Sequence, residues 1–462
     1  MADKLITSAQ SKSFDIKKCL IYSNDEKTQV DIGTLITDIY YYESVLNPTL
    51  KVDVLYVDTG TVKKDGDIKG VLEALELVGT EKVDLELTDP NDKKIKVTLY
   101  SDSIKPISKE NRKSLVGLSL VSKESIFNYK SAVNTRFDGK ISDHVRKILK
   151  EFLNVDGKKK LDIEETSNNY NFIGNNRRPF YAILWLARKA IPKTPNAQGN
   201  TAGYFFFETS EGYKFKSVEG LLSENEPGGG KKKYKSLVYN ETPDGRGTSV
   251  PPEYSGKVLD YNMDTPAGNI QSKLEIGTYS TRTILFDPFN CYYEIINPNV
   301  KGDKGAEKNL QKAGKNLPKY NREFNVEGQN KDFSRTQYML LDKGTLPTGS
   351  GTGKSQEQLT KSKEENYDPK NILNQSVMRY NQFFSTKVTI TITGDFSLHA
   401  GDYIYIDTPE MANKSTKTMD KQFGGYYVIA ELCHYISKKD GGYSKLTLVR
   451  DSIGRKGSPT PM

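Results

Sequence analysis

The sequence predicts a β-rich α+β protein with two similar antiparallel, barrel-like β domains, a small helix-containing domain and a long irregular insertion. Apolar and polar residues alternate in two regions of the 462-residue chain, which is the period of half-buried strands. Between these regions the spacing becomes helical and then gives way to a polar stretch. We therefore divide the chain into a first β domain (1–122), a small α/β domain (123–220), an irregular outer region with short strands (221–384) and a second β domain (385–462).

Strands in the first β domain are predicted from runs in which every second residue is apolar. These runs cover 52–56, 83–87, 95–99 and 118–120. The turn residues Asp89 to Asp92 separate two of the runs, so we expect these two to form a hairpin.

Two helices are predicted in the small α/β domain. The first runs from Ser142 to Leu153, with Ser142 as a plausible N-cap residue. The second runs from Arg178 to Ala190, because Pro179 suits a first helical turn and apolar residues surround the single tryptophan, Trp185.

The outer region is the hardest part of the chain to interpret. Its apolar runs are short, at 257–259, 278–286 and 338–341. The stretch 301–327 holds few large apolar groups and can bury little surface on its own. A section of this length is usually either functional or a linker.

Four strands are predicted in the second β domain, at 385–393, 403–406, 426–432 and 443–448. Turn signals such as Gly401-Asp402 lie between them, which is typical of a meander or a small barrel.

Composition and charge argue against several classes of function. The formal net charge of +8 is modest for this length, and the one dense basic run is best explained as a solvated loop: Lys231, Lys232 and Lys233. The odd number of widely spaced cysteines argues against a disulfide framework or a zinc site and indicates a reducing compartment: Cys19, Cys291 and Cys433. No signal-peptide pattern or run of about 18 apolar residues is found, so we expect no membrane anchor.

The sequence offers no convincing catalytic, cofactor or metal site, and we expect none. His144, His399 and His434 have no second ligand at metal-binding spacing on the same element. Cys433 and His434 are adjacent on a predicted strand and so point to opposite faces. The loop Gly349–Ser355 resembles a phosphate-binding loop, but Thr348 occupies its first glycine position, and a flexible Gly/Ser loop is the ordinary interpretation.

Several segments, in their order along the chain, resemble the baseplate hub family of contractile-tailed bacteriophages, which is related to late-control and type VI spike proteins. Those segments are Gly79–Leu87, Ile141–Leu149, Arg178–Ala187, Leu398–Ile404, Gly425–Ile429 with His434, and Gly442–Leu448. The stretch 301–375 matches nothing in this pattern.

The resemblance implies a structural virion protein that is not an enzyme. Each subunit of such a hub has two similar β tube domains, so a homotrimer presents six around one channel, joins the central spike to the tail tube and contacts other baseplate proteins. Genome DNA passes through only transiently, and the particle assembles in the bacterial cytoplasm. Five residues are candidates for channel or interface positions: Thr389, Thr391, Thr393, Tyr403 and Tyr405.

Two alternatives remain open from the sequence. A tail-associated peptidoglycan hydrolase would need two carboxyl groups across one cleft, and no local pattern selects such a pair. A carbohydrate-binding tail-tip protein would use some of the 28 tyrosines to stack on sugars, although tyrosine is equally common in protein interfaces.

Overall fold

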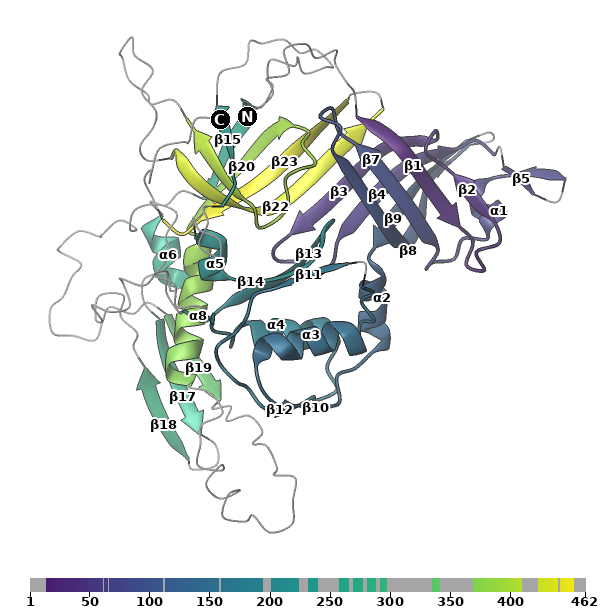
Figure 1. Ribbon diagram of the computed structural model, residues 1–462. Coiled ribbons are helices and arrows are strands. Elements are labelled where there is room, and N and C mark those ends of the chain that lie inside the picture. Colours follow the sequence, from purple (N-terminus) through teal and green to yellow (C-terminus); the bar gives the residue numbers. More distant parts are fainter. Residues whose placement is uncertain are drawn as a thin grey trace, which may run out of the picture.

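In the computed structural model, two β-barrels lie side by side above a small α/β domain, and a helix-and-sheet unit lies beside that domain (Figure 1). The structure describes residues 14–60, 62–64, 66–110, 113–157, 159–193, 201–223, 232–239, 257–265, 269–276, 281–287, 291–296, 335–340, 369–408, 423–438 and 441–452.

The first β domain is an open barrel of six main strands. Its main elements are β1 (Asp15–Tyr22), β3 (Ile36–Ser44), β4 (Lys51–Asp58), β7 (Lys82–Thr88), β8 (Lys94–Lys109) and β9 (Ser114–Val121). Shorter elements complete it: β2 (Gln29–Asp31), β5 (Val62–Lys64), β6 (Asp67–Lys69) and α1 (Val71–Leu75). The predicted hairpin is confirmed, since β7 pairs with β8 in antiparallel register.

The second β domain is a closed six-stranded barrel. Its elements are β15 (Lys235–Tyr239), β16 (Lys257–Thr265), β20 (Thr386–Thr393), β21 (Tyr403–Asp407), β22 (Gly425–Ser437) and β23 (Gly441–Arg450). The four predicted strands are confirmed as β20 to β23. Of the two predicted arrangements, the small barrel is confirmed and the meander is wrong, because β15 and β16, from the range assigned to the outer region, lie between β21 and β20.

The α/β domain packs helices against a three-stranded sheet in the order β11-β14-β13. Its elements are α2 (Lys123–Lys130), β10 (Arg136–Phe137), α3 (Ile141–Glu151), β11 (Lys160–Ile163), β12 (Phe172–Ile173), α4 (Pro179–Ala187), β13 (Tyr204–Thr209), β14 (Gly212–Ser217) and α5 (Val218–Leu222). Both predicted helices are confirmed, and Pro179 opens α4 as expected. Ser142 is not the N-cap of α3: Lys140 takes that place, and the Ser142 amide donates to Thr166 Oγ1 at 3.0 Å.

The outer unit consists of one long helix, one short helix and a three-stranded sheet. These elements are α6 (Ile270–Ile276), β17 (Thr281–Asp287), β18 (Tyr292–Ile296), β19 (Arg335–Leu340) and α8 (Pro369–Phe383). The strand order is β18-β17-β19, with β17 and β19 parallel. The glycine-rich loop 349–355 lies outside the described residues, as does most of the polar stretch 301–375.

The hydrophobic cores follow the same division. One core continues through both barrels, a second fills the α/β domain, and a third joins the second barrel to β13, α5 and α8. Among the described helices, none has the length and apolar character needed to cross a membrane.

Candidate functional surface

The two barrels repeat one strand order. When the six main strands of each barrel are numbered along the chain, their neighbours run first-fourth-fifth-sixth-third-second in both. Directions also agree except at the first strand, since β15 runs parallel to both neighbours while β1 is antiparallel to β7. The two domains are therefore similar, as the sequence predicts.

The barrels are joined by direct strand pairing between β3 and β22. Residues Asp38–Ser44 of β3 pair with Glu431–Ser437 of β22, whereas the earlier residues of β22 pair with β21. Strands β1 and β3 are both described and do not pair with each other, so the strands of the first barrel do not close it. Its last strand, β3, pairs instead with β22 of the second barrel. In the second barrel the corresponding strands, β15 and β16, do pair and close the barrel. The result is one continuous sheet across both barrels.

The surface of this sheet that faces away from the core is the candidate functional surface, and we call it the polar sheet face. Thr389, Thr391 and Thr393 are half-buried and alternate with fully buried residues of β20. Their partners on β23 are Thr447, Lys445 and Tyr443, which are also at least partly exposed. The predicted wet face of this strand is thus present.

Tyr403 and Tyr405 do not share that face. All five residues of β21 are buried, and the two tyrosines pack in the core between the second barrel and the α/β domain. Of the five candidate channel or interface residues, the structure therefore brings together the three threonines and places the two tyrosines apart from them. The strand Tyr403-Ile404-Tyr405-Ile406 is covered on both sides, so its alternation of aromatic and aliphatic residues does not mark a solvent face.

Four tyrosines gather on the polar sheet face where the barrels meet. Tyr40 and Tyr42 of β3 stack at 6.4 Å, Tyr435 of β22 lies 5.0 Å from Tyr40, and Tyr443 of β23 lies 4.9 Å from Tyr435, measured between ring centroids. A hydrogen bond to Asp38 raises the pKa of Tyr435 to about 12. Sequence reasoning missed this cluster, since only the pairing of β3 with β22 brings it together.

A buried carboxylate, Glu43 on β3, ties three parts of the chain together. It accepts hydrogen bonds from Tyr41 (2.6 Å), from the Ser210 amide of the α/β domain (2.8 Å) and from the Ala400 amide of the second barrel (3.0 Å). The Nδ1 atom of His399 lies 3.3 Å away. Burial opposes ionisation of Glu43, but His399 and the other donors hold the pKa of its carboxyl below the ordinary value.

A second buried cluster joins the first barrel to the α/β domain. Lys159 lies 2.5 Å from Glu124 and 2.6 Å from Glu208, and both carboxylates are buried. Glu208 also accepts from the Leu50 amide at 2.9 Å and from the Ser122 hydroxyl. Burial lowers the pKa of Lys159, but the two carboxylates outweigh it, so the lysine stays charged.

A third cluster centres on Arg379 of α8, which is fully buried. Its guanidinium lies 2.7 Å from Glu219 of α5 and 2.7 Å from Asp451, just after β23. It also donates to Gln382 at 3.3 Å. The outer helix is thereby fixed to both the α/β domain and the second barrel.

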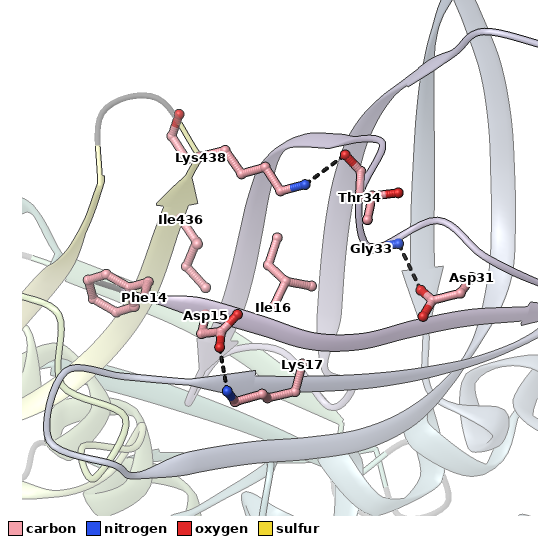
Figure 2. A pocket seen from close by; sticks show the side chains of 10 residues that line it. Phe14, Asp15, Ile16, Lys17, Asp31, Gly33, Thr34, Ile436 and Lys438 are labelled. Carbon is pink, nitrogen blue, oxygen red and sulfur yellow. Dashed lines mark hydrogen bonds and ion pairs between the residues drawn. The ribbon is translucent and has the colours of Figure 1, made fainter. Parts of the chain in front are cut away.

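A pocket of about 330 Å³ lies beside the joint between the barrels (Figure 2). Its polar groups are already engaged with one another: Lys438 donates to the Thr34 carbonyl at 2.7 Å, and Asp15 pairs with Lys17. Asp31 accepts from the Gly33 amide at 2.8 Å. The lining therefore shows a packed joint and no pattern that selects a ligand.

His144 and His434 make contacts inside the fold. His144 contacts the Tyr170 carbonyl at 2.8 Å, and burial lowers its pKa. His434 lies in the middle of β22, not at a strand margin, and its Nδ1 lies 2.7 Å from the Ser444 hydroxyl. Within the described part of the chain no three His, Cys, Asp or Glu side chains are grouped to hold a metal ion.

No protein-family model matches the sequence, and no curated protein matches it either. Solved structures do. A tail protein from Neisseria meningitidis MC58 is similar over 96% of this chain and 98% of its own, with 9% identity and a TM-score of 0.50. This chain shares the fold of that tail protein.

Two further solved structures are similar to this chain. The 43 kDa tail protein of prophage MuSo2 from Shewanella oneidensis has 10% identity and a TM-score of 0.48, with 94% of this chain and 98% of that chain covered. The E. coli c3393 protein, a type VI secretion component described as similar to T4 tail proteins gp27 and gp5, has 9% identity and a TM-score of 0.42 over 97% and 81%. The expected β-rich fold with two similar β domains is confirmed by the strand order of the two barrels.

Proposed function

We propose that the chain is a structural subunit of a phage baseplate hub in which three copies form one ring. The observation that carries this proposal is the repeated strand order of two barrels lying side by side in one sheet. Two equivalent units per chain turn a threefold assembly into a pseudo-sixfold ring. Such a ring adapts a trimeric central spike to a hexameric tail tube.

In this proposal the polar sheet face lines the channel through which the genome leaves. Two of its lysines are paired with carboxylates, Lys51 with Asp53 (3.2 Å) and Lys18 with Asp84 (3.2 Å). The threonines of β20 add neutral polar groups. Pairing with carboxylates weakens the attraction of these lysines for DNA phosphates, which favours passage over binding. The expected partners are the spike, the tail tube and other baseplate proteins, and the expected location is the virion.

The proposal is tested by the mass and image of the purified protein. We expect a species of about 156 kDa, three times the 51.9 kDa of one chain, measured by light scattering with size-exclusion chromatography. Class averages from electron microscopy should show six lobes around a central hole. A stable dimer, or a trimer without a hole, contradicts the proposal.

A further inference from the structure

The outer sheet presents an apolar face that nothing in the described part of the chain covers. In register across the three strands lie Phe286 of β17, Tyr293 of β18 and Leu340 of β19. The next row contains Ile284, Ile295 and Tyr338. Tyr338 is 78% exposed, Leu340 67% and Tyr293 63%. Leu285, on the opposite face, is buried.

This face is large enough to be an interface. At 150–250 Å² per buried aromatic side chain, its three exposed rings alone offer on the order of 300–450 Å². The largest apolar patch on a typical monomer is about 300–600 Å² and is often functional, and a standard interface buries roughly 800 Å² per partner. The described residues of the face include one charged group, Arg282, whereas transient contacts are usually richer in charge.

A second apolar surface lies on α4 and α2 of the same chain. The sequence of α4, Pro179–Ala187, is apolar almost throughout, and such a helix is normally buried on all sides. Nevertheless Tyr181 and Leu184, one turn apart, are exposed, and Tyr129 of α2 is 68% exposed beside them. The Arg178 guanidinium lies 4.2 Å from the Tyr129 ring centroid, and Arg177 lies 5.4 Å from that of Tyr181.

The two surfaces have the chemistry and placement of a contact between copies of one chain. Tyrosine and arginine dominate the energetically important positions of interfaces, and arginine also packs on aromatic faces such as those of the outer sheet. In Figure 1 the outer sheet and α2 lie on opposite sides of the α/β domain. A rotational ring of three requires a contact between two different surfaces of the chain, because a patch that meets itself closes a dimer.

We propose that the outer sheet face (Phe286, Tyr293, Ile295, Tyr338 and Leu340) of one subunit binds the α4 face (Tyr129, Tyr181 and Leu184) of a second copy. The contact rests on the proposed threefold hub and adds to it a second ring of contacts, below the barrels. The occupant of the sheet face is thus another molecule of this chain.

The test uses two double variants of the full chain, each of which disables one surface. The sheet variant carries Tyr338→Asp and Leu340→Asp, and the helix variant carries Tyr181→Asp and Leu184→Asp. We expect each variant alone to associate at least about 100-fold more weakly than the original protein in analytical ultracentrifugation, because charges are placed at desolvated interface positions. Far-ultraviolet circular dichroism and the unfolding midpoint check that both still fold.

An equimolar mixture of the two variants then decides whether the surfaces meet each other. The intact sheet face of the helix variant can bind the intact α4 face of the sheet variant, so a one-to-one heterodimer should appear in the mixture only. Matched apolar variants, Tyr338→Phe with Leu340→Met and Tyr181→Phe with Leu184→Met, should assemble like the original protein.

Other outcomes overturn the contact. Full association of the helix variant alone means that the α4 face is not used, as when the outer sheet pairs with itself. Full association of the sheet variant alone means that the sheet face is not used, as when the chain's own residues 297–334 cover it. A mixture that stays monomeric means that the surfaces bind something else, and an original protein that stays monomeric refutes the contact outright. If each double variant still forms a trimeric ring, this contact is refuted and the proposed hub is not. If the original protein forms a closed ring of another size that requires both faces, the contact is supported and the proposed threefold hub is refuted.

Discussion

At the residue scale, Phe14 belongs in sequence to the first barrel but packs on the second. Its ring lies 5.5 Å from that of Phe396, measured between centroids, and fills the space beside two glycines. A Cβ at Gly442 would lie 2.7 Å from the Phe14 ring, and one at Gly394 would collide with it. The absence of side chains at these positions therefore lets the start of β1 attach to the neighbouring barrel.

Gly394→Ala should destabilise the protein by about 1–3 kcal/mol, because the new methyl group must displace Phe14. In a Phe14→Ala background the same substitution should cost much less, since the obstructing ring is absent. Denaturant unfolding of the four proteins in this cycle measures the coupling. An equal cost in both backgrounds would show that Phe14 is not what Gly394 accommodates.

The pair of His399 and Glu43 gives the stability a defined pH dependence. Burial lowers the pKa of His399, but the hydrogen bond and charge of Glu43 outweigh it and raise the pKa above 6.5. The stabilisation from this pair is therefore complete below pH 6.5 and is lost as pH rises through the raised pKa. Glu43 has a pKa below 4.5, so its contribution is lost only as pH falls through that lower value. Asp402, Lys214 and Glu211 also face this site.

His399→Gln should therefore cost more unfolding free energy at about pH 5.5 than at about pH 8.5. His144→Gln is the matched control with the opposite sign. Burial lowers the pKa of His144, so as pH falls the histidine is protonated in the unfolded chain before it is protonated in the folded one, and the folded state loses stability. His144→Gln removes this loss, so it should cost less unfolding free energy at about pH 5.5 than at about pH 8.5. Denaturant titrations at both pH values measure the two differences. The same pH trend for both variants would contradict the assigned roles.

At the scale of elements, a buried cation adds to the apolar core in holding α8 in place. Arg379→Met leaves Glu219 and Asp451 buried without their partner, and it should cost about 3–5 kcal/mol. Adding Glu219→Gln and Asp451→Asn to that variant should recover part of the loss, because two uncompensated charges disappear. Hydrogen exchange of α8 and α5, together with denaturant unfolding, measures both effects. A triple variant less stable than the single one would contradict this account.

The strands also show how far sequence patterns reach. The alternation of β20 predicted its wet face, because threonines and β-branched apolar residues sort the two sides. In β21 both sides are apolar, so periodicity could not reveal which face the α/β domain covers. β15 and β16 were missed as barrel strands because both lie far from their partners in sequence, and no local pattern specifies pairing with β21 and β20.

The candidate surface was only partly predictable for the same reason. Thr389 and its neighbours follow from one strand, whereas the tyrosine cluster of Tyr40, Tyr42, Tyr435 and Tyr443 depends on the register between β3 and β22. In the sequence, Glu43 and Arg379 cannot be told apart from the many acids and bases that are exposed. Only their surroundings distinguish them.

At the scale of the whole molecule, the shared sheet and the buried ionic clusters make the barrels and the α/β domain interdependent. We expect one calorimetric transition for these three parts, although chains of this length commonly unfold in several steps. The double variant Glu43→Gln with Glu208→Gln should split that transition, because it weakens the links between them. Two resolved transitions in the original protein would show that the parts unfold independently.

The ladder between β3 and β22 also determines how the molecule responds to mechanical load. Ladder hydrogen bonds lie perpendicular to the strands, so a pull along the strand direction shears every bond between Asp38–Ser44 and Glu431–Ser437 at the same time. A pull across the strands would instead open the bonds one by one from an end. The joint is therefore strongest along β3 and β22, and a load in that direction is the one least able to separate the barrels.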